Sequence, residues 1–440
     1  MINPISRLMV DFKQMKEFVD APFVIERAEG IFLYDDHGKQ YIDGIAGVFV
    51  ASVGHSNPSV LRAISEQMQR LAFAPPLHST TQTAIDLAER LCKLLPEQFN
   101  TVKFASGGSE AIESAIKMSL QYHKQTGHPE KFKIISTYGS YHGGTLGALS
   151  VTGMADRRSS FEPLMGGRIH VHPPNFANCP LKLDARQCNI SCVLQFEEAI
   201  RREGPETIAA VLLEPVMNAE GLVWPPRSYF ESLRRICDAN NVLLIYDEVI
   251  TGFGRTGTMF FAEQAGAWPD LMCLGKGMSG GYAPLAATVI SDRIASAFWG
   301  NAEAKVQFNA GHTFAGNPVS CAAGLAILDC FEEQHLLKHV ADVGPYLEEK
   351  LRQLKNKFTC IVDVRGLGLW WGVDLAQDNP TGKAADDVGR RLERASRARG
   401  LVLRGSPSTV SFGPPLTITQ HQIDDLINRF TLALQDLVDS

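Results

Sequence analysis

The chain has 440 residues, of which 45% are hydrophobic and 20% are charged, and its formal net charge is −6. This length allows two or three domains around a large core, and the composition is typical of globular proteins. The negative balance argues against nucleic acid as the main partner, because phosphate binding needs a basic face. No secretory signal and no apolar stretch of membrane-spanning length is visible, so we expect a cytoplasmic location and no membrane segment.

The first part of the chain predicts a hairpin and two helices, followed by alternating strands and helices. Short strand patterns at 30–38 and 40–43 flank a turn, and helical patterns occupy 58–71 and 82–95. Beyond residue 100, strands are expected at 101–105, 133–137, 208–214, 242–247, 271–274 and 286–290, and helices include 110–124 and 229–240. Such alternation, with nearly continuous apolar strands, predicts an α/β fold with a mostly parallel sheet covered by helices.

The later part of the chain has a different pattern. Residues 172–192 contain three prolines and no clear periodicity, which predicts a long loop. Beyond about residue 340, helices are expected at 343–357 and 383–399, and strands at 360–364, 369–375 and 401–404. This part of the chain therefore predicts a separate, smaller α+β domain.

Two residues near strand ends carry the strongest chemical signal. Asp247 ends the apolar run 242–247, and Lys276 lies between two glycines after the next strand. A lysine here is costly unless its amine reacts or is paired, and desolvation lowers a lysine pKa toward the free nucleophilic amine. The pair predicts a pyridoxal 5'-phosphate site, with Lys276 as the Schiff-base lysine and Asp247 as the partner of the pyridine nitrogen. A helix cap or a buried ion pair with Arg255 is the structural alternative for Asp247.

Residues 104–112 predict a phosphate-binding turn. A strand ends, glycines turn the chain at Gly108, and a helix begins near Ser109. The free N–H groups and the dipole of a helix N-terminus attract phosphate, although an ordinary capped helix has the same pattern. Thr313 offers another polar group near a helix start, whereas Asn317 beside a proline is more typical of capping.

Four more residues fit the surroundings of a planar, charged ligand. Tyr141 and His142 lie in a glycine-containing loop after a strand, where an aromatic ring can lie on a cofactor, but a surface turn explains them equally well. Val249 could pack on the opposite ring face. Arg404 ends an apolar strand, where a guanidinium needs an anionic partner. That partner is either a substrate carboxylate or an acidic side chain in a structural ion pair.

The sequence disfavours two other kinds of site. Gly252-x-Gly-x-x-Gly257 resembles a dinucleotide fingerprint, but no amphipathic helix opens at its last glycine. His170, His172 and three cysteines fall in one region, yet their spacing matches no common zinc pattern, so no metal is expected. The nine cysteines include no Cys-x-x-Cys pair, which favours reduced thiols.

Six motifs together resemble those of the class III pyridoxal-phosphate aminotransferases, of the fold-type I superfamily. They lie at residues 106–111, 141–143, 214–215, 247–257, 275–277 and 312–318. They occur in the family's order, and the resemblance extends from about residue 20 to about residue 430. It implies a large cofactor-binding domain at 76–340 with a seven-stranded sheet. It also implies a small α+β domain formed by residues 1–75 and 341–440.

The resemblance further implies a role for each matching residue. Lys276 and Asp247 would be catalytic, and Tyr141 and Val249 would hold the cofactor ring between them. The remaining cofactor contacts would come from Gly108, Ser109, His142, Glu214 and Thr313. Thr313 would be supplied by the partner subunit of a homodimer. A tetramer is the alternative assembly.

Within the family, the chain resembles the amine–pyruvate subgroup of omega-transaminases. Members that use 2-oxoglutarate carry a glutamate shortly after Glu-Pro, where this chain has Ala219, although Glu220 is adjacent. Arg404 would be a switching arginine for the carboxylate of pyruvate, and Phe49 falls where the subgroup has an aromatic pocket residue. The implied partners are a small amine or omega-amino acid donor and an oxo-acid acceptor. A 2-oxoglutarate-using aminotransferase and an aminomutase or racemase are the alternatives.

Overall fold

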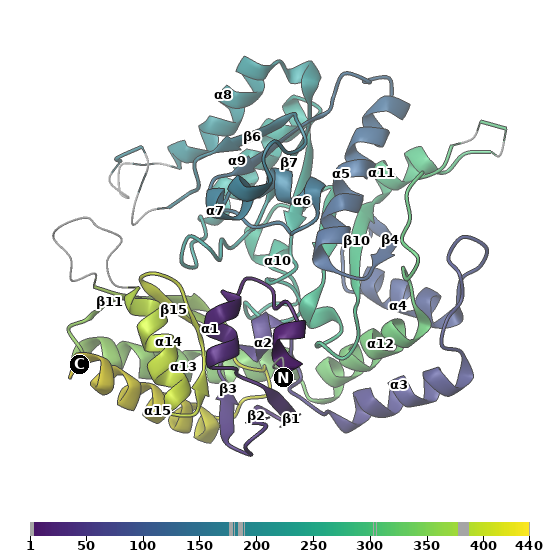
Figure 1. Ribbon diagram of the computed structural model, residues 1–440. Helices are drawn as coiled ribbons and strands as arrows, with labels where there is room; N and C mark the ends of the chain where they lie inside the picture. Colours follow the sequence, from purple (N-terminus) through teal and green to yellow (C-terminus); the bar gives the residue numbers. More distant parts are fainter. Residues whose placement is uncertain are drawn as a thin grey trace.

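The computed structural model describes residues 4–175, 179, 181–183, 188, 190–301, 303–304, 306–376 and 387–439. Its centre is a seven-stranded sheet flanked by helices, and a smaller part with two four-stranded sheets lies below it in Figure 1. The expected α/β class, with one seven-stranded sheet and a smaller α+β part, is confirmed. The domain boundaries at residues 75 and 340 stay a prediction.

The central sheet has the strand order β4-β10-β9-β8-β7-β5-β6. The β9-β8, β8-β7, β7-β5 and β5-β6 pairs are parallel, whereas β10 is antiparallel to both of its neighbours. The strands are β4 (Phe99–Ala105), β5 (Lys133–Thr137), β6 (Arg168–Val171), β7 (Ile208–Leu213), β8 (Leu243–Asp247), β9 (Leu271–Leu274) and β10 (Ala286–Ser291). The sequence pattern does not predict β6, because its four residues mix polar and apolar side chains.

The apolar strands are explained by burial on both faces of this sheet. Every residue of β7, β8 and β9 is buried. Successive side chains of a strand point to opposite faces. Leu244 therefore joins the cluster that contains Phe230 of α9 (Arg227–Ala239), whereas Ile245 joins the cluster that contains Ile112 of α5 (Gly108–Gln125).

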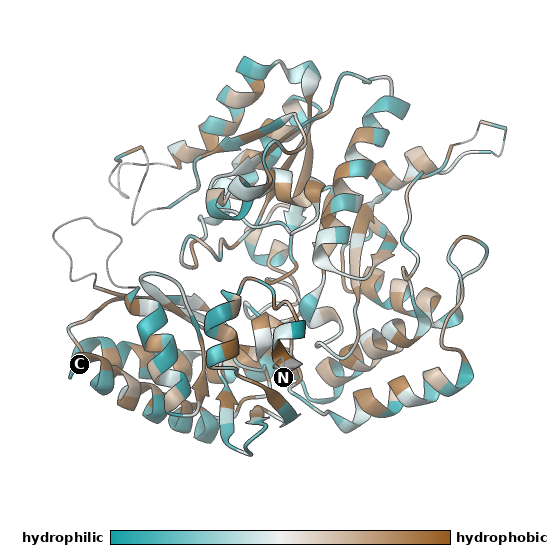
Figure 2. Ribbon diagram, in the orientation of Figure 1, coloured by the Kyte–Doolittle hydropathy of each residue, from teal (hydrophilic) through white to brown (hydrophobic). Residues whose placement is uncertain are grey.

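The other helices of this part lie around the sheet. The predicted helices at 58–71 and 82–95 are present as α3 (Pro58–Arg70) and α4 (Gln82–Lys93), which both pack against α12 (Pro318–Glu333). Figure 2 shows polar and apolar residues alternating around α3, as expected for a helix with one buried side. The remaining helices are α6 (Leu146–Val151), α7 (Ala155–Arg158), α8 (Leu194–Glu203), α10 (Ala262–Ala265) and α11 (Asp292–Ala295).

The smaller part joins both ends of the chain. One sheet has the order β1-β2-β3-β13 and the other β11-β12-β15-β14. The strands are β1 (Ile25–Glu29), β2 (Phe32–Asp35), β3 (Gln40–Asp43), β11 (Ile361–Leu367), β12 (Trp370–Leu375), β13 (Leu401–Val402), β14 (Arg404–Gly405) and β15 (Thr409–Phe412). The helices are α1 (Met15–Asp20), α2 (Ala46–Phe49), α13 (Leu336–Lys357), α14 (Val388–Ala398) and α15 (Gln420–Val438).

Three expectations near the chain's irregular segments need adjustment. The helix expected at 343–357 begins earlier, at Leu336, and contains Pro345 within it. The expected loop at 172–192 ends in the single turn Ser191–Val193, and the expected helix at 383–399 is described from Val388. The remainder of the expected loop at 172–192 and of the expected helix at 383–399 falls partly outside the described residues. None of the described helices has the length and apolar character that a membrane span requires.

Candidate active site

The predicted cofactor residues come together at the carboxyl ends of neighbouring strands. β8 ends at Asp247, Glu214 follows β7, and Lys276 lies two residues beyond β9. Tyr141 and His142 lie in the loop after β5. Open α/β sheets bind ligands at this edge, so the fold places the sequence candidates where a site is expected.

Lys276 has the backbone and the electrostatic surroundings of a reactive amine. It begins the single turn Lys276–Met278 with a φ of +43°, a left-handed conformation that a residue with a Cβ adopts at a cost. Burial lowers the pKa of its amine, while the carboxylates of Asp247 and Glu214 raise it and Arg404 lowers it further. The fold therefore brings Asp247, Glu214 and Arg404 close enough to Lys276 to influence its charge.

Asp247 is held by two donors and is only 7% exposed. Its Oδ1 accepts a hydrogen bond of 3.1 Å from the backbone N–H of Val249, and its Oδ2 lies 2.9 Å from Nδ1 of the buried His142. The alternative of an ion pair with Arg255 is not observed, because the Arg255 guanidinium donates to the carbonyl oxygens of Leu369 and Pro414. His142 is thus the direct partner of the carboxylate.

Glu214 holds the loop that carries Tyr141. Its Oε1 accepts a 2.6 Å hydrogen bond from the backbone N–H of Tyr141, and Oε2 accepts a longer one, 3.4 Å, from Asn218. Burial raises the pKa of Glu214 to about 7, with Asp247 adding to the rise and His142 opposing it. Glu214 therefore orients the Tyr141 loop through its main chain.

The phosphate-binding turn has close backbone approaches. Gly108 begins α5, and a Cβ at this position would lie 2.9 Å from Cγ1 of Val249. Ser109 Oγ accepts a 3.0 Å hydrogen bond from the backbone N–H of Gly144. A Cβ at Gly143, whose φ is +139°, would collide with Ser109. The glycines thus let the loop after β5 lie against the N-terminus of α5, whose free N–H groups suit a phosphate.

This set of groups fits pyridoxal phosphate. It combines an amine with a lowered pKa, a buried carboxylate for a ring nitrogen, a helix N-terminus for a phosphate, and Val249 packed against that helix start. The chemistry of each group matches one part of the cofactor.

The aminotransferase class-III family model matches residues 14–434. The chain belongs to the class III aminotransferases. It is 41% identical over 422 residues to a probable aminotransferase, Rv3329, of Mycobacterium tuberculosis, with 94% of this chain and 90% of that protein covered. It is 32% identical over 420 residues to a probable mitochondrial gamma-aminobutyrate transaminase 3 of Oryza sativa subsp. indica, with 94% and 82% covered.

Solved structures give the same assignment. An (S)-enantioselective omega-transaminase from Thermomicrobium roseum superposes with a TM-score of 0.92 at 36% identity, covering 99% of this chain and 97% of that one. An omega-transaminase from Pseudomonas jessenii in complex with PMP gives 0.94 at 33% identity, again covering 99% and 97%. The protein is an aminotransferase that depends on pyridoxal phosphate.

Two arginines of this class III aminotransferase approach Tyr141. Arg404 in β14 and Arg157 in α7 both lower the pKa of Tyr141 against the larger rise caused by burial. The guanidinium carbon of Arg157 also lies 4.4 Å from the ring centre of Phe12, so the N-terminal segment reaches this area. Arg157 could not be found from the sequence, because a short, polar helix gives no signal of its position relative to Tyr141.

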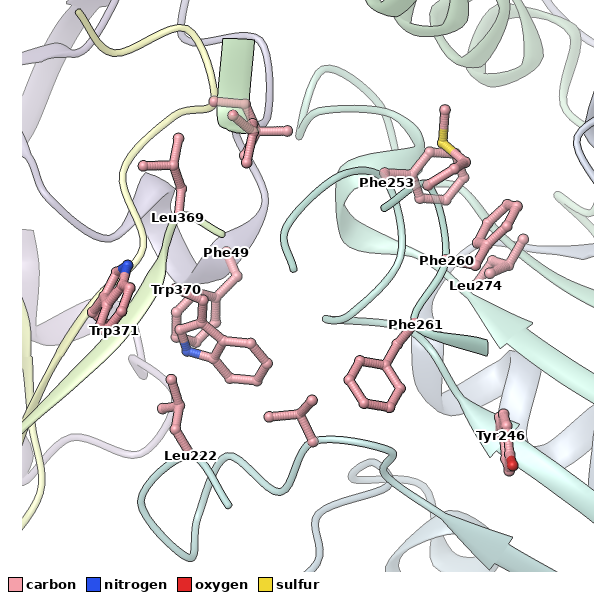
Figure 3. Close-up of a cluster of buried hydrophobic side chains, with 14 of the residues drawn as sticks. Phe49, Leu222, Tyr246, Phe253, Phe260, Phe261, Leu274, Leu369, Trp370 and Trp371 are labelled. Carbon is pink, nitrogen blue, oxygen red and sulfur yellow. The ribbon is translucent and has the colours of Figure 1, made fainter. Parts of the chain in front are cut away.

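The structure of the single chain does not bring Thr313 and Phe49 into this cluster. Thr313 lies exposed in a loop after β10, without a hydrogen bond to another predicted site residue in the described part of the chain. Phe49 is 2% exposed, and its ring centre lies 5.1 Å from that of Trp370. Figure 3 shows the two side chains packed together. Their assigned roles therefore stay predictions.

The described part of the aminotransferase has one further groove that lies apart from the predicted site residues. A groove of about 550 Å³ between β6 and α8 is lined by residues that include Tyr138, His170, His172 and Arg202, and it contains none of the predicted site residues. Within the described ranges, no group of His, Cys, Asp or Glu is arranged to hold a metal ion. Nor does any disulfide link the described cysteines.

Proposed function

We propose that this aminotransferase moves an amino group from a primary amine or omega-amino acid to pyruvate, in two half-reactions. The observation that supports this acceptor is the state of Arg404. Arg404 is exposed in the single chain, its guanidinium forms no ion pair in the described part of the chain, and partial desolvation and Arg157 lower its pKa. Glu393 is the acidic residue that raises the pKa of Arg404, and its Oε2 accepts a 2.8 Å hydrogen bond from the backbone N–H of Gly405. An unpaired guanidinium in a site suits a substrate carboxylate.

Glu220 supports pyruvate over a dicarboxylate acceptor. Its Oε2 accepts a 3.1 Å hydrogen bond from the side chain of Asn175, and its carboxylate lies over Gly139. Ala219 has no charge, and neither residue pairs with Arg404 among the described residues. An arginine without an acidic partner can bind an acceptor with one carboxylate and move away from a donor that has none.

Each residue of the site would have a distinct role in the reaction. The Lys276 amine, kept unprotonated by its lowered pKa, would take a proton from the donor carbon and return it during transfer. Asp247 would be the partner of the cofactor's ring nitrogen. Pyridoxal phosphate, when bound, supplies the electron sink for the carbanion. Tyr141 and Val249 would hold the ring, and Gly108 and Ser109 would hold the phosphate at the start of α5.

Arg404 provides the test of the acceptor. We expect Arg404→Ala to raise the KM for pyruvate by about 10- to 150-fold, the effect of losing a charged hydrogen bond of about 1.5–3 kcal/mol. Donor turnover with an amine that lacks a carboxylate should change less than about twofold, by the same logic. Glu220→Gln is the matched control and should leave both values unchanged. A wild-type preference for 2-oxoglutarate would contradict the pyruvate assignment.

Two alternatives are separated by the same assays. One alternative is a 2-oxoglutarate-using aminotransferase of the 4-aminobutyrate type, and the name of the Oryza relative, a gamma-aminobutyrate transaminase, supports such an omega-amino acid as donor. It predicts faster turnover with 2-oxoglutarate and a large effect of Glu220→Gln. An aminomutase or racemase needs no acceptor, so stoichiometric transfer of nitrogen to the oxo-acid excludes it. Replacement of Lys276 by alanine must abolish the visible absorbance of the bound cofactor in every case.

We also propose a homodimer in which Thr313 completes the phosphate site of the partner subunit. The support is apolar surface beside Thr313: Phe314 is 61% exposed and its ring centre lies 6.0 Å from that of Phe73, which is 42% exposed. Leu77, which is 87% exposed, adds to the apolar surface of the preceding segment. Exposed apolar patches of this kind favour burial by a partner. Sedimentation of the holoenzyme tests the proposal, and a fully active monomer would overturn it. We also propose that the protein is located in the cytoplasm.

A further inference from the structure

Residues 43–54, which we call the bridging segment, begin beside the strand that leads to Arg404. The backbone N–H of Gly44 donates to the carbonyl oxygen of Val402 at 2.9 Å. A Cβ at Gly44 would lie 2.7 Å from Cδ2 of Leu403, the residue directly before Arg404. The position of the Arg404 backbone is therefore coupled to the start of the bridging segment.

The other end of the bridging segment contacts residues 276–282, which we call the lysine turn. The buried Ser52 donates from Oγ to the carbonyl oxygen of Gly277 at 3.2 Å, next to Lys276. Tyr282, at the end of the lysine turn, donates from its hydroxyl to the carbonyl oxygen of Gly54 at 2.9 Å. One short segment thus connects the surroundings of the arginine to those of the reactive lysine.

The backbone between these two ends is strained. Ala46, Gly47 and Phe49 have φ values of +47°, +70° and +62°, and α2 contains all three residues. Left-handed backbone is costly for a residue with a Cβ, and it persists only where the surroundings fix it. Without such a constraint this turn would relax, and the two ends of the bridging segment would move relative to each other.

The carboxylate of Asp43 supplies this constraint. It is fully buried, and its Oδ1 and Oδ2 accept hydrogen bonds of 3.1 Å and 2.9 Å from the backbone N–H of Gly47. Oδ1 also accepts a 3.3 Å bond from the backbone N–H of Ile45, and Oδ2 lies 2.8 Å from Nε2 of His55. Because His55 directly follows the bridging segment, one carboxylate ties together its start, its strained turn and its end.

We propose that Asp43, held by His55, is a positioning residue that sets the distance between the Arg404 guanidinium and the Lys276 amine. An acceptor whose carboxylate binds Arg404 must present its reacting carbon near Lys276, so it depends on this distance. A misplacement of about 1 Å can lower a rate about 100-fold. A donor that lacks a carboxylate does not depend on Arg404. The inference rests on the proposed function for the role of Arg404.

The variant Asp43→Asn tests the proposal with little change of shape. Only one of the two terminal atoms of an asparagine side chain accepts hydrogen bonds, whereas both oxygens of the carboxylate do. The contact with Gly47 through one of the two atoms is therefore lost. This change should loosen the strained turn without emptying the space that the side chain fills.

Amide hydrogen exchange of the full-length apoprotein gives a direct readout. In Asp43→Asn we expect exchange to become about three- to tenfold faster in the bridging segment, in the lysine turn and in residues 402–405, the effect of one lost hydrogen bond. Faster exchange confined to the bridging segment, or no change, would overturn the proposal. The measurement needs no cofactor or substrate, so its failure is distinct from a failure of the proposed function.

The two half-reactions of the holoenzyme test the positioning role separately. In single-turnover measurements of Asp43→Asn, we expect kcat/KM with pyruvate to fall by about 10- to 100-fold. The value with an amine that lacks a carboxylate should fall by less than about threefold. A general loss of structure would lower both values by the same factor, and that result would overturn the proposal.

Ser52→Ala is a second variant that leaves the strained turn intact. It removes the hydroxyl that donates to Gly277, so exchange should become faster in the lysine turn but not in residues 402–405. The value of kcat/KM with pyruvate should fall by about three- to tenfold, and again more than the value with the amine. Equal decreases would overturn the proposal even if Asp43→Asn did not fold.

Asp35→Asn is the matched control. The Asp35 carboxylate also holds a turn, because its Oδ1 accepts hydrogen bonds from the backbone N–H of His37 at 3.0 Å and of Lys39 at 2.8 Å. It lies in β2 of the same sheet and has no role in the site. Asp35→Asn should leave both half-reactions and the exchange of the lysine turn unchanged. Effects equal to those of Asp43→Asn would overturn the proposal.

Discussion

Glu214 accepts a hydrogen bond of 2.6 Å from the backbone N–H of Tyr141. The bond joins the ends of two neighbouring parallel strands, since Glu214 follows β7 and Tyr141 lies beyond β5. It holds the loop that carries both Tyr141 and His142 against the sheet. The orientation of these two side chains therefore depends on a carboxyl group that is only 9% exposed.

Glu214 should make stability depend on pH in a defined direction. Burial raises the pKa of Glu214 from 4.5 to about 7, so the folded chain binds this proton more tightly than the unfolded chain. Its contribution is full below about pH 4.5 and is lost as the pH rises through about 7. In Glu214→Gln the apoprotein should lose less stability between these pH values, measured by denaturant unfolding. An identical loss in both proteins would contradict the prediction.

Gly108 should not accept a methyl group while Val249 stays in place. In Gly108→Ala the new Cβ would lie 2.9 Å from Val249 Cγ1, which forces the start of α5 away from the site. Overpacking of this kind costs about 1–3 kcal/mol, so we expect affinity for pyridoxal phosphate to fall by about 5- to 150-fold in a titration. The double variant Gly108→Ala, Val249→Ala should recover part of the affinity. No recovery would show that the collision is not the cause.

Asp247→Asn should separate cofactor chemistry from folding. Asparagine keeps the size of the side chain but removes the negative charge opposite the ring nitrogen. We expect kcat to fall by about 10- to 150-fold, which corresponds to a charged hydrogen bond of about 1.5–3 kcal/mol. Thermal unfolding of the apoprotein should change little by comparison. A variant with wild-type turnover would show that Asp247 has no electrostatic role in the reaction.

Arg255 should matter for stability rather than for chemistry. It is 2% exposed, and its Nη1 donates to the carbonyl oxygens of Leu369 at 3.0 Å and Pro414 at 2.7 Å. Arg255→Met leaves both buried carbonyls without this donor, so the free energy of unfolding should fall by about 2–5 kcal/mol. Lysine at this position should recover part of the loss. A decrease in kcat without a decrease in stability would point to a catalytic role instead.

Most of the fold could be predicted from local pattern. The buried strands β7, β8 and β9 are nearly continuous apolar runs, and such runs are unambiguous when helices separate them. β6 was missed because four residues of mixed polarity give too short a periodic signal. The early start of α13 was missed because Pro345 lies inside the helix, where a proline normally indicates a boundary.

The sequence by itself determined the family, the cofactor and the residues that end the central strands, because motifs in a fixed order carry that information. Only the tertiary structure decided which residues contact each other. Asp247 pairs with His142, and Glu214 holds the Tyr141 loop. Arg157 approaches Arg404, and Phe49 packs on Trp370. These contacts join segments far apart in the chain. Their distances follow from strand order and side-chain packing, which no local pattern records.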